Sequence, residues 1–191
     1  MAPAALDTLL LKPAEIDAVL GTAGISPQPT IADMNDHRDV VTNLNCLGVW
    51  QSDEAAVYEN TGWNGLRSQT LRSPDTDVWN DLVVQSVVSY PSAGAARTFF
   101  AQSSDRWSAC VNHRLSIAVS GQPSRWQSGD LTKNDTELTM PVTRQGGDQV
   151  RSCQRILAMK DNVIIDTEAC KPQPVASADA IVRQIETKFP Q

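Results

Sequence analysis

The pattern of hydrophobic and polar residues along the chain predicts a β-hairpin between residues 153 and 170. Two runs rich in Ile, Leu, Val and Met flank Asp161-Asn162, a pair that tolerates the positive backbone angles of a two-residue turn. The register of such a hairpin sets Cys153 opposite Cys170, at a spacing that a disulfide can bridge. We therefore expect these two cysteines to be bonded, the alternative being two buried free thiols.

Strand patterns also occur earlier in the chain. β-Branched residues crowd the segment 82–90, and residues 66–72 have a similar character. Short segments separated by Gly, Pro, Asn and Asp then precede the hairpin, at 115–119, 124–131 and 137–143. Short strands divided by turn residues are typical of an antiparallel meander, which we expect in this part of the chain.

Helical periodicity occurs at both ends of the chain and once in the middle. Pro13 can begin a helix that ends at Gly21, and the apolar positions of residues 177–188 fall on one face. Ser92 can cap a longer helix whose apolar row ends near Cys110. The sequence therefore predicts three helices that pack on the strands.

Residues 22–45 lack such periodicity and contain several Pro, Asp and Asn, so we expect an extended crossing there. One or two short helices should follow between residues 46 and 59. Helices around consecutive strands predict an α+β fold, in which an antiparallel sheet is packed with helices. Because 191 residues are enough for one sizeable core, we expect residues 1–191 to form a single domain.

Composition argues against several classes of partner. The 22 acidic and 16 basic residues give a net charge of -6, which disfavours binding to nucleic acid or to an anionic membrane surface. No window reaches the roughly 18–20 apolar residues that span a bilayer. The first residues lack the basic region and the long apolar run of a signal peptide, so none is expected there.

The four cysteines predict two disulfides. With Cys153 and Cys170 assigned to each other by register, Cys46 and Cys110 are left to form the second bridge. No pair has the close spacing of a structural zinc site, and both histidines are isolated from such a pair, so no metal is expected. Two disulfides would place the protein in an oxidising compartment.

Motifs for catalysis are missing from the sequence. There is no nucleophile elbow, phosphate-binding loop or metalloprotease helix, and His113 has no nucleophile motif beside it, so we expect no enzyme and no cofactor. Asp166, in the predicted hairpin, is interpreted as a carboxylate at a sheet edge or rim rather than a ligand contact. Arg155 and Glu168 face each other in that hairpin and are expected to form a favourable charge pair.

Tryptophan is the commonest aromatic residue, with five copies against three phenylalanines and two tyrosines. Trp107 belongs to the apolar row of the predicted middle helix and is expected in the core. Trp63 and Trp126 lie in turn-rich or polar stretches, with Arg67 and Arg125 close by in sequence. Two interpretations stay open: each covers an end of the core, or they form the aromatic wall of a polar cleft.

Several stretches of the chain resemble one known family. They are LLLKPAEIDAVLG, CLGVWQSDEAAVYENTGW, VVQSVVSYPSAGAARTFF, WSAC, CQRILAMKDNVIIDTEAC and the terminal ADAIVRQIETK. These stretches are similar to the extracellular sensor domain of PknH-type mycobacterial receptor Ser/Thr kinases, a domain that also occurs in envelope lipoproteins. The resemblance covers nearly the whole chain, includes all four family cysteines, and is most specific at W-x-x-C and in the C-Q-R hairpin.

The resemblance implies a two-disulfide domain on the extracellular or periplasmic side of the cell envelope. Its cleft would bind an unidentified polar small molecule or cell-wall fragment, and a transmembrane segment outside this chain would connect it to a cytoplasmic kinase. The chain itself has no Gly-rich loop, HRD or DFG motif. From side-chain chemistry we expect ligand contacts at Tyr58, Trp63, Arg67 and Arg106. The alternative is a ligand- or protein-binding domain of a secreted protein or a lipid-anchored envelope lipoprotein.

Overall fold

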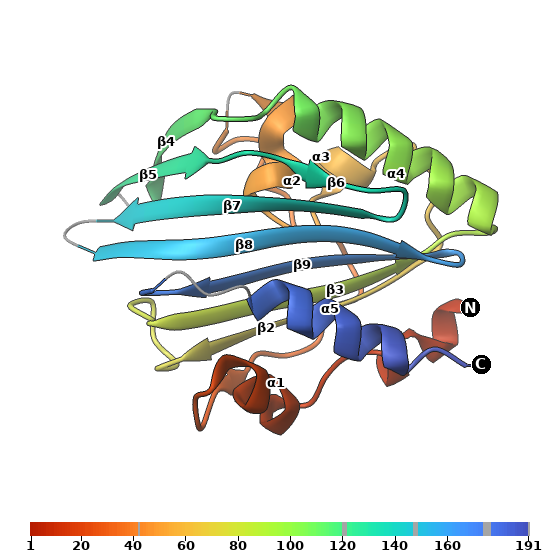
Figure 1. The fold of residues 1–191 in the computed structure, drawn as a ribbon, viewed down its shortest axis with the longest axis horizontal. Coiled ribbons are helices and arrows are strands. Elements are labelled where there is room, and N and C mark those ends of the chain that lie inside the picture. The colour runs from red at the N-terminus through yellow and green to blue at the C-terminus, as the bar shows by residue number, and fades with distance from the viewer. Residues whose placement is uncertain (42, 120–121, 147–148, 174–176, 191) are drawn as a thin grey trace.

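The fold is built on one antiparallel sheet. The computed structural model describes the chain except for residues 42, 120–121, 147–148, 174–176 and 191. Its described part contains nine strands, in the order β1-β2-β3-β9-β8-β7-β5-β4 with β6 paired to β7 (Figure 1). Their bounds are β1 Ser26–Pro27, β2 Gly65–Ser73, β3 Asp81–Ser89, β4 Arg114–Val119, β5 Gln122–Ser128, β6 Thr132–Lys133, β7 Glu137–Gly146, β8 Gln149–Lys160 and β9 Val163–Lys171.

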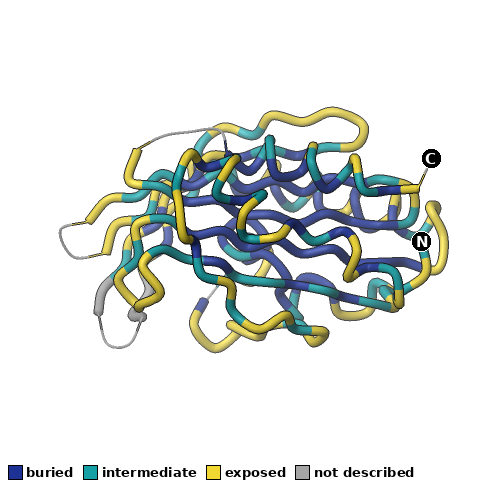
Figure 2. The backbone as a smooth tube through the Cα atoms, turned by 90° about the horizontal axis from the view of Figure 1, so that it is seen from below, coloured by how far each residue is buried: buried dark blue, intermediate teal, exposed yellow. Residues whose placement is uncertain are grey.

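Helices cover both faces of the sheet. The 3-10 helix η1 (Pro3–Thr8), α1 (Pro13–Leu20) and α5 (Ser177–Thr187) pack on one face, while η2 (Leu44–Cys46), α2 (Leu47–Trp50), α3 (Ala55–Tyr58) and α4 (Ala93–Ser108) pack on the other. Each face has its own buried apolar cluster, because alternate residues of a strand point to opposite sides. Figure 2 shows the buried strands enclosed between these outer layers. The predicted α+β class is confirmed.

Local sequence patterns locate the helix ends. Helix α1 begins at Pro13 and ends at Gly21, which has the left-handed backbone conformation (φ 66°) that favours glycine. The side chain of Ser92 accepts a hydrogen bond of 3.1 Å from the backbone N–H of Ala95 and so caps α4. Both predicted helices are confirmed, as is the short helical stretch between residues 46 and 59.

The antiparallel meander predicted for the second half of the chain is confirmed, because β4, β5, β7, β8 and β9 are successive neighbours in the sheet. Strand β3, however, pairs with β9 and thereby places residues 81–89 beside residues 163–171. Strand β9 is buried along almost its whole length and takes a central position in the sheet, with β3 on one side and β8 on the other.

Both predicted disulfides are present. Cys153 and Cys170 are direct partners in the β8–β9 ladder, with Cα atoms 3.9 Å apart. Cys46 is bonded to Cys110, with Cα atoms 5.6 Å apart, and this bridge ties η2 to the segment that follows α4. The hairpin register deduced from the Asp161-Asn162 turn is therefore confirmed over its whole length.

One expectation about the charged residues of the hairpin is wrong, and a second holds only in part. Asp166 does not lie at a sheet edge: it is 2% exposed, because β9 is enclosed by β3 and β8. Arg155 faces Glu168 in the ladder, but its guanidinium pairs with Asp166, two residues away along β9 on the same face, at 2.6 Å. Glu168 instead lies 3.5 Å from Arg144 of β7. Register alone did not decide the partner, since long side chains reach diagonal neighbours.

Candidate functional site

A cleft of about 670 Å³ opens at one end of the sheet. At this end β2 runs into β3 and β7 into β8, on the left in Figure 1, while the N- and C-termini lie at the other end. The volume is within the range of small-molecule binding sites. Its lining comes from five segments: Asn35 and His37; Gln51, Asp53 and Glu54; Thr70, Asp77, Val78, Trp79, Leu82 and Val84; Ser124 and Trp126; and Arg144, Gly146, Gln149 and Arg151.

A row of arginine and tryptophan crosses the sheet at the cleft. Trp126 of β5, Arg144 of β7 and Arg151 of β8 are successive cross-strand partners, so their side chains leave the sheet on the same face. The guanidinium of Arg144 lies over the Trp126 ring, 3.7 Å from its centroid. Arg151 lies 4.4 Å from the centroid of the Trp79 ring, in the β2–β3 connection. Each arginine is thus held by an aromatic face.

Burial lowers the pKa of both arginines that line the cleft. It lowers the pKa of Arg144, although the nearby Glu168 carboxylate acts in the opposite direction, and it also lowers the pKa of Arg151. Both groups stay cationic at neutral pH, because the ordinary pKa of arginine lies far above 7. The cleft therefore has two partly desolvated positive charges at its sheet side.

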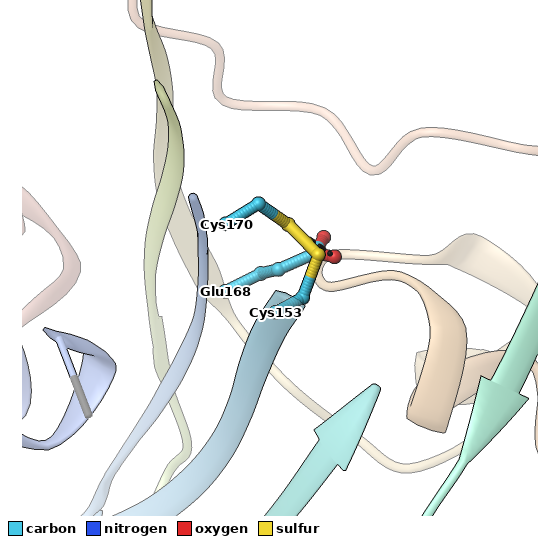
Figure 3. A group of neighbouring side chains, drawn as sticks. All are labelled: Cys153, Glu168 and Cys170. Carbon is cyan, nitrogen blue, oxygen red and sulfur yellow. Dashed lines mark hydrogen bonds between the residues drawn. A yellow bond between two sulfur atoms is a disulfide. The ribbon is translucent and has the colours of Figure 1, made fainter. Parts of the chain in front are cut away.

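Glu168 and the disulfide lie next to this row. Figure 3 shows the Glu168 carboxylate beside the Cys153–Cys170 bond, with Oε1 3.3 Å from the Cys170 sulfur. These three residues are the one group in the described part of the chain that brings metal-ligand atoms together. Both sulfurs are committed to the disulfide, however, and thiolates are the form of cysteine that binds metals. The group therefore stabilises the hairpin and is not a metal site in this state.

Acidic side chains form the opposite wall of the cleft. Glu54 is 1% exposed and accepts hydrogen bonds from the backbone N–H of His37 and from its Nδ1, at 3.1 and 2.5 Å. This contact raises the pKa of His37. Asp53 is 3% exposed, and burial raises its pKa to about 7, although hydrogen bonds from Ser68 and Asn35 oppose the rise. At neutral pH Asp53 is therefore only partly ionised.

A buried network attaches this acidic wall to the sheet. Arg155 donates from Nη2 to the carbonyl oxygens of Gly48 and Gln51, at 2.8 and 3.1 Å, as well as to Asp166. Asp166 in turn accepts from the backbone N–H of Asp53 at 3.2 Å. Burial disfavours the charge on Arg155, but attraction by Asp166 and Glu168 raises its pKa above the ordinary value. One ion pair on the sheet therefore fixes the loop that forms a wall of the cleft.

The four residues predicted to contact a ligand are not among those that line the cleft. Tyr58 is fully buried and donates to Asp166 at 2.9 Å, so it belongs to the network under the wall. Arg67 points to the opposite face of the sheet, where it pairs with Asp7 of η1 at 2.7 Å. Arg106 donates to the carbonyl oxygen of Val57, and Trp63 packs against the apolar core. The fold does not bring them together, and ligand contact at any of them stays a prediction.

Trp126 fits both interpretations, since it lines the cleft and, at 5% exposed, also belongs to the apolar core. Arg144 and Arg151 were missed by sequence reasoning. Gly146-Gly147 indicates a turn in the sequence, but a two-residue loop on these glycines would pair Arg144 with Gln149. The opposition of Arg144 and Arg151 is therefore known only from the register of the structure. No pattern in the sequence around Trp79 or Asp53 indicates that they line a cleft, because their positions depend on how two loops pack against distant parts of the chain.

No helix of the described residues combines the length and apolar character needed to cross a bilayer.

Comparison with known proteins gives one consistent result. A model of the PknH-like extracellular domain matches residues 1–188. The crystal structure of the extracellular domain of PknH from Mycobacterium tuberculosis matches with a TM-score of 0.90 at 28% identity, over 98% of this chain and 96% of that chain. The serine/threonine-protein kinases PknH of Mycobacterium bovis and M. tuberculosis are 28% identical over 183 residues, 96% of this chain. The chain spans 30% of the M. bovis kinase, and the part matched is the extracellular domain.

Proposed function

The chain belongs to the PknH-like extracellular domain family, and from this we propose that it is the ligand-sensing domain of a transmembrane Ser/Thr kinase. A polar ligand of the cell envelope, either a small molecule or a cell-wall fragment, binds in the cleft at the β2–β3 and β7–β8 end of the sheet. The observation that carries this proposal is the cleft itself, which combines a volume of about 670 Å³ with converging arginine, tryptophan and carboxylate side chains.

The way the cleft is held supports a binding role. Its sheet side is fixed by the β7–β8 and β8–β9 ladders, and its loop side by hydrogen bonds from Arg155 to Gly48 and Gln51. A pre-organised site loses little conformational entropy when a ligand binds. The polar groups around the cleft are therefore ready to make hydrogen bonds without prior refolding.

Relay to the kinase is the second part of the proposal. A ligand shifts the equilibrium between two receptor arrangements only by its difference in affinity for them. In this cleft such a difference can arise because the two walls come from separate parts of the chain, the loop at residues 51–54 and the sheet row that includes Arg144 and Arg151. A ligand that touches both walls favours the arrangement in which they are closest.

Binding is tested with soluble cell-wall fragments, followed by tryptophan fluorescence and thermal shift. Thr70→Tyr places a ring inside the cleft, whereas Thr98→Tyr makes the same change on the exposed surface of α4. We expect fragments to raise the melting temperature of the unmodified protein and of Thr98→Tyr, but not of Thr70→Tyr. An equal response in all three proteins would show that the fragments bind outside the cleft and would contradict the proposal.

Relay is tested in a chimera. The extracellular domain of M. tuberculosis PknH is replaced by this chain, and autophosphorylation of the kinase is measured in membranes with and without the fragments. A ligand-dependent change that Thr70→Tyr abolishes is the expected result. Binding without any change in phosphorylation would limit the domain to a binding module, as in an envelope lipoprotein.

A further inference from the structure

Two arginines oppose each other directly at the cleft. Arg144 and Arg151 are cross-strand partners in the β7–β8 ladder, and both line the cleft. Like charges at directly opposed positions of a sheet destabilise the pairing. A local conflict of this kind is uncommon in a sequence that otherwise agrees with its fold, and such conflicts concentrate at functional sites.

The carboxylates nearby neutralise only part of this charge. Arg155 takes Asp166 as its partner, and Arg144 takes Glu168, which leaves Arg151. Among the described residues Arg151 has no carboxylate partner: its hydrogen bonds go to the carbonyl oxygen of Trp79 and to Gln149, both uncharged. The Nε atoms of both cleft arginines are buried without a hydrogen-bond partner in the described part of the chain.

The other acids of the cleft are engaged elsewhere. Glu54 is bonded to His37. Asp77 is fully exposed and lies 3.5 Å from Arg72. Asp53 hydrogen-bonds to Asn35 and lies on the loop side of the cleft. Counted over the described residues, the sheet side of the cleft therefore carries a net positive charge, although the whole chain has a charge of -6.

We propose that Arg144 and Arg151 form an anion subsite of the cleft, which takes a phosphate or carboxylate group of the ligand. This inference rests on the cleft's being the binding site, and it names the chemical class of the ligand. Guanidinium groups suit both anions, because their planar donors bind two oxygens at once. Stacking on Trp126 and Trp79 holds both groups in place before the anion arrives, so that little side-chain entropy is lost on binding.

A matched set of hexoses tests the proposal. Glucose 6-phosphate carries a phosphate, glucuronate a carboxylate, glucosamine an ammonium group, and glucose no charge. Each is titrated at constant ionic strength to about 10 mM, a range that covers millimolar affinities. The readout is the set of NMR signals from the tryptophan indole N–H groups, since Trp79 and Trp126 contact the two arginines.

We expect glucose 6-phosphate, glucuronate or both to shift the Trp79 and Trp126 signals at concentrations at least tenfold below those needed with glucose. The anion that shifts the signals at the lower concentration shows whether the subsite prefers phosphate or carboxylate. Arg151→Gln should abolish the preference over glucose. Arg97→Gln, which removes an exposed charge on α4, should leave it unchanged.

Three results would overturn the anion subsite. The first is binding of glucose or glucosamine at least as tight as that of both anions, and the second is the absence of any shift with either anion. Retained preference in a folded Arg151→Gln protein would also overturn it. If cell-wall fragments still raise the melting temperature of the unmodified protein but not of Thr70→Tyr, the cleft remains the binding site. The failure of the anion subsite can therefore be told apart from the failure of the proposed function.

Discussion

Arg155 and Asp166 form a buried ion pair on neighbouring strands, with Nη2 and Oδ1 2.6 Å apart and both side chains at most 3% exposed. The same guanidinium also donates hydrogen bonds to the carbonyl oxygens of Gly48 and Gln51, and the same carboxylate accepts one from the backbone N–H of Asp53. The pair thereby connects the centre of the sheet to the loop that forms one wall of the cleft.

Arg155→Met should lower the free energy of unfolding by about 3–5 kcal/mol, because it leaves the buried Asp166 charge without its partner. The double variant Arg155→Met/Asp166→Leu should recover part of this loss, since both desolvated charges are then gone. Urea unfolding measures both. Arg183→Met, which removes an exposed pair with Asp179, is the control and should cost no more than about 1 kcal/mol. If Arg155→Met costs no more stability than the control Arg183→Met, the ion pair does not support the wall.

Tyr58→Phe should lower stability by about 1.5–3 kcal/mol. Its hydroxyl donates to the Asp166 carboxylate at 2.9 Å in a fully buried position, and hydrogen bonds to charged groups are the stronger kind. Tyr90→Phe provides the comparison, because the Tyr90 hydroxyl pairs with the neutral hydroxyl of Thr61 at 3.1 Å. We expect a loss of about 1 kcal/mol there. Equal losses in thermal unfolding of the two variants would speak against a charge-assisted bond at Tyr58.

Serine at both Cys153 and Cys170 should lower stability by about 3 kcal/mol, and serine at both Cys46 and Cys110 by about 4 kcal/mol. The difference arises because the second bridge closes a longer loop, with a sequence separation of 64 against 17, and so restricts the unfolded chain more. Chemical unfolding without reductant measures both pairs. The reverse order would indicate that native contacts around the bridges outweigh loop entropy. In the folded fraction of Cys153→Ser/Cys170→Ser we expect ligand affinity to be retained, since the β8–β9 ladder sets the register by itself.

Asp53 should contribute a fall in stability as the pH rises from about 4 to about 7. Burial raises the pKa of Asp53 from 3.8 to about 7, so the folded state holds a proton that the unfolded chain has lost. The stability that this proton confers is complete below the unfolded pKa and is lost as the pH passes the folded one. His37, whose pKa is raised by Glu54, changes stability in the same direction near and above its ordinary value of 6.5.

Asp53→Asn should flatten this dependence, because an amide does not titrate. Each unit of pKa shift corresponds to about 1.4 kcal/mol, so the difference between pH 4 and pH 8 should shrink by a few kcal/mol. Thermal unfolding over this pH range measures it. The matched control, Asp105→Asn on the exposed side of α4, should leave the curve unchanged. A curve of unchanged slope in Asp53→Asn would mean that Asp53 is ionised in the folded protein throughout.

Much of the fold could be predicted from short stretches of sequence. The Asp161-Asn162 turn fixed the β8–β9 register, and with it one disulfide; the other cysteine pair followed by elimination. Proline, glycine and serine located the ends of α1 and α4. These features depend on residues close in sequence, where turn geometry and side-chain capping act directly.

The candidate site was predicted less well. Tyr58 and Arg67 are polar or aromatic residues in suitable stretches, yet one lies in the core and the other on the far face of the sheet. The far-face position of Arg67 follows from alternation along β2, but the sequence does not state which face carries the cleft. The polar residues around Trp126 in the sequence suggested that it could line a cleft, and in the structure it does so while also packing in the core.

The sequence by itself determined the helices, the hairpin register, the cysteine pairing and the resemblance to an extracellular sensor domain. Only the tertiary structure decided that β3 lies beside β9, that Arg155 takes Asp166 rather than Glu168, and that Arg144 and Arg151 share a cleft with Trp79. The physical reason is the range of the interactions. Turns, caps and hairpins are local, whereas the cleft exists because loops distant in sequence pack against one end of the sheet, and burial there selects which charges are paired.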